Sequence, residues 1–140
     1  MSGMLEGIKV IDMGQVVAIP ATGAILADMG AEVIKLEPLT REIQRGNRRS
    51  QGLETVSLNW AVQVLNRNKK GLALNLKTDS GREILYKLIR TADVFMSNYE
   101  LSALANLKLD YATLSKINPR LIYATMNGYG SAGPDREERG

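Results

Sequence analysis

The sequence predicts an α/β protein in which helices cover both faces of a parallel, Rossmann-like sheet. Short apolar runs alternate with segments of helical periodicity along most of the 140 residues. Several of these runs are continuous and rich in β-branched residues, which is typical of strands buried on both faces. The first unit also has the order strand, loop, helix, strand, which requires a parallel pair and a right-handed crossover. Together these observations favour a doubly wound sheet.

The first unit defines the edge of the sheet where a ligand is expected. Residues 8–13 form its first strand, and Pro20 suits the first position of the helix that follows. Gly30 suits the left-handed position after that helix, and residues 33–37 form the second strand. Ligands of such sheets bind beyond the carboxyl ends of the strands, where the segment Met13–Ile19 is expected.

The middle of the chain begins with a polar stretch, residues 39–54, which lacks periodicity and is interpreted as a long surface loop. Apolar residues at helical spacing predict a short helix within residues 56–65. Leucines then alternate with other residues from 72 to 76, which predicts a third strand.

The last part of the chain contains three predicted helices and two predicted strands. Thr78 or Asp79 caps the first helix. Its expected buried stripe is Ile84, Leu85, Leu88 and Ile89. Strands are expected at 93–97 and 121–126, with short helices at 102–107 and 111–117 between them. If the sheet is parallel, Gly14–Ala18, Ser97–Leu101 and Asn127–Gly130 gather at one edge.

Composition narrows the possible chemistry. With 44% apolar and 24% charged residues the chain has the composition of one globular domain. No apolar run reaches the roughly 18 residues of a membrane span and no signal sequence is recognised, so we expect a cytoplasmic protein without membrane contact. The absence of cysteine and histidine excludes disulfides, thiolate nucleophiles, imidazole bases and the usual zinc sites within this chain, and we predict no metal site.

Basic residues concentrate in the middle of the sequence. Between residues 41 and 77 there are eight lysines or arginines (Arg41, Arg45, Arg48, Arg49, Arg67, Lys69, Lys70 and Lys77) and two acids (Glu42 and Glu54). This excess favours a polyanionic ligand, although a solvated loop and strand entry explain it equally well. Nucleic acid is disfavoured because Trp60 is the only aromatic residue in the segment. The spaced glycines of a dinucleotide fingerprint and the Walker motif are both missing.

Blocks of residues spread over nearly the whole chain carry a family resemblance. They are Leu5-x-Gly7-Ile8-x-Val10-Ile11-Asp12, Ala18-x-Pro20, Leu26-Ala27-Asp28-x-Gly30-Ala31-Glu32-Val33-Ile34-Lys35-x-Glu37-Pro38, Asn66-Arg67-Asn68-Lys69-Lys70, Leu74-x-Leu76-Lys77, Ala92-Asp93-Val94, Asn118-Pro119-Arg120-Leu121-Ile122-Tyr123-Ala124, Gly128-Tyr129-Gly130 and Gly133-Pro134. The sequence thereby resembles the amino-terminal part of the class III CoA-transferases, which include formyl-CoA transferase and the related alpha-methylacyl-CoA racemases.

The resemblance implies a substrate and a set of contacts. Coenzyme A would be a substrate, not a tightly bound cofactor, and it would move between an acyl-CoA and a free carboxylic acid. The implied CoA contacts are Val17, Ala18, Leu74, Asn75, Leu76, Lys77, Asn98, Tyr99, Tyr129 and Gly130. Lys77 is the best cation among them, and its alternative interpretation is an exposed lysine at a strand end.

The resemblance also implies what this chain lacks. The family uses an aspartate that forms acyl-aspartyl and aspartyl-CoA intermediates, and the spacing from Gly128-Tyr129-Gly130 places that residue beyond Gly140. We therefore name no catalytic residue and expect residues 1–140 to be the amino-terminal part of a large CoA-binding domain, inactive by itself. A homodimer is expected for the longer protein.

Two alternatives remain open. A racemase of the same family would share these blocks and move the proton next to a thioester carbonyl. A non-catalytic CoA-binding or nucleotide-binding homologue is supported by departures from the family pattern at Ile19, Glu100 and Asn106.

Overall fold

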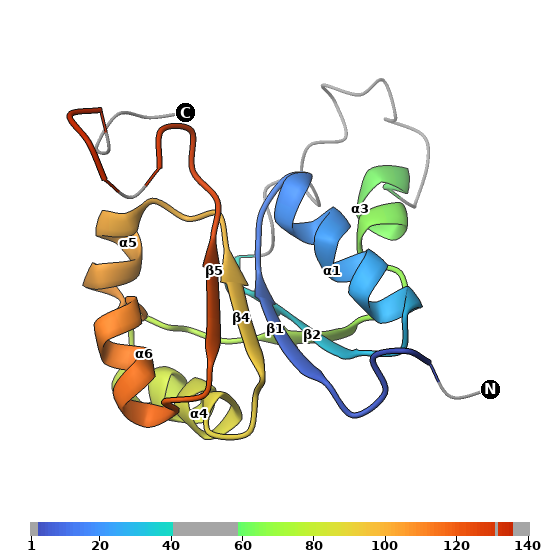
Figure 1. Ribbon diagram of the computed structural model, residues 1–140, viewed down its shortest axis with the longest axis horizontal. Helices are drawn as coiled ribbons and strands as arrows, with labels where there is room; N and C mark the ends of the chain where they lie inside the picture. Colours follow the sequence, from blue (N-terminus) through green and yellow to red (C-terminus); the bar gives the residue numbers. More distant parts are fainter. Residues whose placement is uncertain (1–2, 41–58, 131, 136–140) are drawn as a thin grey trace.

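A computed structural model describes residues 3–40, 59–130 and 132–135 and contains a five-stranded sheet (Figure 1). The strands are β1 Lys9–Met13, β2 Glu32–Glu37, β3 Lys70–Ala73, β4 Val94–Ser97 and β5 Ile122–Thr125. Their order across the sheet is β3-β2-β1-β4-β5, and every neighbouring pair is parallel. The predicted parallel α/β fold is therefore confirmed.

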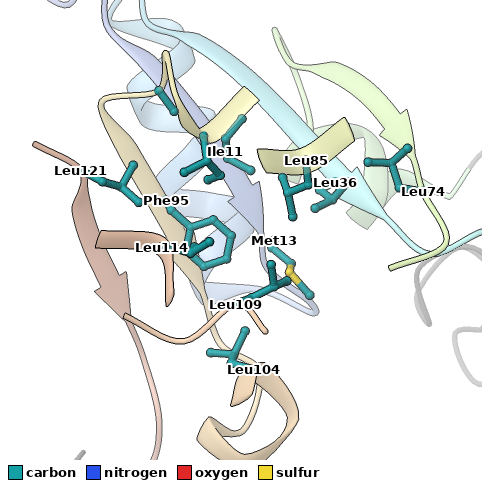
Figure 2. Close-up of a cluster of buried hydrophobic side chains, with 12 residues drawn as sticks. Ile11, Met13, Leu36, Leu74, Leu85, Phe95, Leu104, Leu109, Leu114 and Leu121 are labelled. Atoms are coloured by element: carbon teal, nitrogen blue, oxygen red, sulfur yellow. The ribbon is translucent and has the colours of Figure 1, made fainter. Parts of the chain in front are cut away.

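Helices cover both faces of this sheet, as predicted (Figure 1). One face carries α1 Ala18–Asp28 and α3 Trp60–Leu65, and the other carries α4 Asp79–Ile89, α5 Leu101–Asn106 and α6 Tyr111–Ile117. Successive side chains of a strand point to opposite faces of the sheet, so each strand contributes to the apolar layer on both faces. Val10 and Val33 pack under α1, whereas Ile11 and Leu36 face α4. Figure 2 shows the larger cluster, in which Ile11, Met13, Leu36 and Phe95 of the sheet meet Leu85, Leu104 and Leu114 of the helices.

The third strand lies earlier than the sequence predicts. β3 spans Lys70–Ala73 in place of residues 72–76, and Asn75 ends the extended segment because its carbonyl accepts a turn hydrogen bond from the Thr78 N–H at 3.2 Å. The alternating leucines misled the prediction because Leu76 continues to pack against the core, although the last hydrogen bond to β2 is the one from the Leu74 N–H to the Glu37 carbonyl at 3.0 Å. Leu74 to Lys77 therefore belong to a loop at the carboxyl edge of the sheet.

Two helix predictions also need correction. Helix α1 begins at Ala18, so Pro20 is its third residue, still within the first turn where a missing N–H costs nothing. In α4 the buried side is Gly81, Leu85 and Ile89, and Ile84 is 46% exposed because it lies at the margin of that stripe. Thr78 is the residue that caps α4. Gly30 has φ 102°, the left-handed conformation expected after α1.

The other boundaries agree closely with the sequence. Helix α6 spans residues 111–117 as predicted, α5 begins one residue early, and α3 occupies residues 60–65 behind an Asn59 cap. The predicted loop at 39–54 and the start of the helix predicted at 56–65 fall mostly on residues 41–58, which lie outside the described residues.

Candidate ligand-binding site at the carboxyl edge of the sheet

The chain changes faces between β1 and β4, which are neighbours in the sheet. After β1 the chain enters α1 on one face, and after β4 it enters α5 on the opposite face. Such a change of face between neighbouring parallel strands marks the usual ligand position in doubly wound sheets, beyond the carboxyl ends of the strands. The candidate site is therefore built around the β1–α1 loop, residues 14–17, and the segment after β4.

Side-chain hydrogen bonds join these two loops. The Gln15 N–H donates to Asn98 Oδ1 at 2.7 Å, and Asn98 Nδ2 donates to the Gln15 carbonyl at 2.9 Å. Gln15 Nε2 also donates to the Tyr99 hydroxyl at 2.7 Å. These three hydrogen bonds, between residues more than eighty positions apart, hold the two loops against each other.

The first turn of α1 offers backbone donors at this edge of the sheet. Val17 occupies the N-cap position, makes no side-chain cap hydrogen bond and is 53% exposed. Helical geometry gives the N–H groups of Ala18 and Ile19 no acceptor within the helix. An uncapped N-terminus of this kind attracts anions through its N–H groups and the helix dipole. Val17 and Ala18, both predicted CoA contacts, therefore lie where a phosphate would be favoured.

Val16 precedes this turn with φ 64°, a conformation in which a β-branched residue is strained. Such strain persists only where the surroundings fix the backbone, and it is found disproportionately at binding sites. The loop conformation is thus imposed by its contacts, not by local preference.

A pocket of about 390 Å³ opens on the α4 side of the same edge. Its walls are mostly apolar, with a few polar groups at the rim, which is typical of small-molecule sites. It is lined by Met13, Leu36, Glu37, Pro38, Leu39, Thr40, Leu74, Asn75, Leu76, Lys77, Tyr99 and Leu107.

The structure brings most of the predicted contact residues together, in two groups. Leu74 to Lys77 and Tyr99 line the pocket, and Lys77 is exposed at its rim. Asn98 joins the two loops, while Val17 and Ala18 begin α1. Tyr129 and Gly130 follow β5 at the same edge but do not line this pocket.

Sequence reasoning missed a buried group of charged residues below the β1–α1 loop. Asp12 and Lys35 are register partners on β1 and β2, and their side chains are 0% and 1% exposed. Lys69 reaches the same carboxylate, with Nζ 2.7 Å from Asp12 Oδ2, and Lys35 Nζ lies 3.7 Å from Oδ1. A signal was present, because Asp12 and Lys35 each stand between two apolar residues within a strand.

Gln15, which joins the loops, was also missed, and no local pattern marks it. Among the described residues, no group of three or more acidic side chains is arranged to hold a metal ion. In the same part of the chain, no helix is long and apolar enough to cross a membrane.

Comparison with known proteins identifies relatives over the whole chain. A family model described as CoA-transferase family III matches residues 5–140. Cinnamoyl-CoA:phenyllactate CoA-transferase of Clostridium sporogenes is 38% identical over 97% of this chain and 33% of its own length. Formyl-CoA:oxalate CoA-transferase of Streptomyces avermitilis is 40% identical over 96% of this chain and 32% of its own length. This chain thus spans about a third of the length of these relatives.

The fold also matches a solved structure. A CAIB/BAIF family protein from Brucella suis superimposes with a TM-score of 0.91 at 32% identity, covering 100% of this chain and 37% of that protein. The fold of this chain is therefore that of an existing protein architecture.

Proposed function

The chain belongs to CoA-transferase family III, and from this premise we propose that its carboxyl-edge site binds coenzyme A during CoA transfer from an acyl-CoA to a free carboxylic acid. Relatives named for this reaction support the proposal, since both of those described above are CoA-transferases. Residues 1–140 would form the amino-terminal part of a large CoA-binding domain.

One observation carries the proposal: an apolar pocket with a lysine at its rim and an uncapped helix N-terminus occur at the same edge of the sheet. CoA has an apolar adenine face and three phosphate groups. Apolar walls suit the first, and the Lys77 ammonium and the α1 N–H groups suit the second. CoA would be a substrate here and not a resident cofactor.

The transfer would use the covalent route expected for the family. An aspartate carboxylate attacks the acyl-CoA carbonyl, and the thiolate of CoA leaves. That thiolate then attacks the aspartyl carbonyl, which forms an aspartyl-CoA thioester and releases the donor acid. The acceptor carboxylate reverses these two steps and departs as the new acyl-CoA.

The residues of this chain would bind and orient CoA in that sequence and would not supply the nucleophile. Asp12 is buried between two lysines, and Asp28 pairs with Arg67. Asp93 accepts the Lys9 N–H at 2.9 Å, and Asp110 caps α6. We assign the nucleophile to polypeptide beyond Gly140 and expect the full-length protein to be a cytoplasmic homodimer that binds neither nucleic acid nor membrane.

A non-catalytic CoA-binding homologue is the second candidate, because Glu100 introduces a carboxylate directly after Tyr99 at the site. The departure at Ile19 does not support it. The Ile19 side chain is 6% exposed and packs into the core under α1, so it leaves the loop surface open. CoA binding without transfer by the full-length protein would favour this candidate.

The proposal is tested by substituting Lys77→Ala in the protein at its full encoded length and titrating CoA by calorimetry. Loss of a charge-assisted hydrogen bond should weaken binding roughly ten- to a hundredfold, and added salt should weaken wild-type binding because the site is exposed. Lys70→Ala is the matched control, since Lys70 is an exposed lysine that pairs with Glu32 at the opposite end of β3. Equal CoA affinities of wild type and Lys77→Ala would remove the support that Lys77 gives.

A further inference from the structure

Buried charged side chains hold both polar backbone groups of Gly14. The Gly14 N–H donates to Asp12 Oδ1 at 2.8 Å, and the Gly14 carbonyl accepts a hydrogen bond from Lys35 Nζ. Asp12 and Lys35 are side by side on β1 and β2, directly below the first residue of the β1–α1 loop. The first residue of the loop is therefore anchored to the sheet by the two side chains of a buried ion pair.

Stability alone does not account for this arrangement. Taking an ammonium and a carboxylate out of water is costly, and apolar residues of similar size often serve a core equally well. The strands of a parallel sheet are normally apolar throughout, as β1 and β2 are on either side of these two residues. A lysine that donates from a strand to a loop carbonyl fixes the position of that carbonyl, which no apolar side chain could do.

The next residue, Gln15, is held by Asn98 from the loop after β4. Asn98 bonds both the N–H and the carbonyl of Gln15, so the polar backbone groups of two successive residues are fixed by side chains of three different segments. The chain then passes through the left-handed Val16 to Val17, where α1 begins. The positions of the first α1 N–H groups depend on where Gly14 and Gln15 are held.

We propose that Lys35 is a positioning residue for CoA binding, which acts by fixing the Gly14 carbonyl and thereby the N-terminus of α1. This inference rests on the proposed function. Lys69 serves as the matched control for Lys35, because its side chain is equally buried and pairs with the same Asp12 carboxylate. Lys69 Nζ also donates to the Pro20 carbonyl at 2.7 Å and to Asn66 Oδ1 at 3.3 Å, on the side of α1 and α3.

The test compares Lys35→Met with Lys69→Met in the protein at its full encoded length. Both changes remove a buried ammonium from Asp12, and thermal unfolding records the stability loss of each. Lys35→Met should raise the Kd for CoA about tenfold, whereas Lys69→Met should raise it less than about threefold. In amide NMR spectra, Lys35→Met should shift the signal of Gln15, whose N–H follows the Gly14 carbonyl, more strongly than Lys69→Met does.

Equal CoA affinities of Lys35→Met and wild type would overturn the inference and leave the proposed function standing. Wild-type protein that binds no CoA would instead overturn the proposed function. If Lys35→Met does not fold, amide hydrogen exchange in the wild type tests whether Gly14 is held in place before CoA binds. The Gly14 amide should be protected with and without CoA, and the Ala18 amide should gain protection only when CoA is added. Protection of Gly14 that appears only with CoA would overturn the inference.

Discussion

Gly23 shows how closely α1 approaches the buried charges. A Cβ atom at this position would lie 2.5 Å from Asp12 Oδ2, 2.9 Å from Met96 Cε and 3.0 Å from Lys69 Nζ. Glycine within a helix costs roughly 0.5–1 kcal/mol relative to alanine, so a specific contact must compensate for it. The close packing of α1 over Asp12 and Lys69 is that contact.

Gly23→Ala should therefore destabilise the protein despite the better helix propensity of alanine. The gain of about 1 kcal/mol is smaller than the cost of overpacking beside a fixed ion pair, which is roughly 1–3 kcal/mol and rises when buried hydrogen bonds are displaced. Urea unfolding measures the difference. Gly71→Ala is the control, because a Cβ there would meet nothing within 4 Å. A Gly23→Ala protein as stable as wild type would show that α1 can shift at little cost.

Tyr123 makes stability sensitive to alkaline pH. Burial, and secondarily the negative charge of Asp110, raises the pKa of Tyr123 to about 12, and its hydroxyl donates to the Leu109 carbonyl at 2.9 Å. The unfolded chain has a tyrosine pKa of about 10, so the folded state holds this proton more tightly. The resulting stability is fully present below pH about 10 and is lost as the pH rises towards 12.

The melting temperature should accordingly fall between pH about 10 and 12, and Tyr123→Phe should remove part of that fall. The same variant should be less stable at neutral pH by about 1 kcal/mol, because the Leu109 carbonyl loses its donor. Tyr111→Phe serves as the control, since Tyr111 is 60% exposed. Identical pH profiles for wild type and Tyr123→Phe would mean that another group governs the alkaline transition.

Among the elements, α4 is tied most directly to the pocket. Thr78 Oγ1 accepts the Gly81 N–H at 3.2 Å and donates to the Asn75 carbonyl at 2.8 Å. Gly81 allows this turn, because a Cβ atom would lie 2.1 Å from the Asn75 carbonyl oxygen. The start of α4 and the pocket wall Leu74–Lys77 are thus one structural unit.

Thr78→Ala should lower the free energy of unfolding by about 1 kcal/mol, the usual cost of losing an N-cap. Because the same hydroxyl holds Asn75, the variant should also weaken CoA binding, measured by calorimetry. Thr78→Ser keeps the hydroxyl and should behave like wild type in both measurements. If Thr78→Ser lost as much stability as Thr78→Ala, the methyl group and not the cap would be responsible.

The sequence predicts elements well where local signals agree. Helix α4 has an apolar stripe and a threonine cap, and α1 ends at a glycine with positive φ. The third strand was misplaced because Leu72, Leu74 and Leu76 share a packing pattern, although hydrogen bonds to β2 end near Ala73. An alternating apolar pattern shows which residues are buried. The ends of a strand depend instead on hydrogen bonds to a neighbouring strand far away in the sequence.

At the scale of the whole molecule, the strand order explains why the site forms where it does. β1 and β4 are neighbours whose chains leave to opposite faces, so two loops more than eighty residues apart meet. The family resemblance implied Lys77, Asn98 and Tyr99 from motifs in the sequence, and the parallel strand order places these residues at one edge. The Lys35 bond to Gly14 could not be read from sequence, because it depends on the register between β1 and β2.

The last prediction concerns the 140-residue chain by itself, which spans about a third of its relatives' length. Transfer through an aspartyl thioester needs a carboxylate free to attack the acyl carbonyl. Asp12 is buried and paired, and Asp28 and Asp110 are held by Arg67 and Thr113, which lower the pKa of each carboxyl against the opposing effect of burial. Because we assign the nucleophile to polypeptide beyond Gly140, the 140-residue chain should form no new acyl-CoA when supplied with an acyl-CoA and a free acid, as measured by chromatography. The protein at its full encoded length is the positive control under the same conditions. Turnover by the 140-residue chain would contradict our assignment of the nucleophile to polypeptide beyond Gly140 and would direct attention to the acidic residues of this chain.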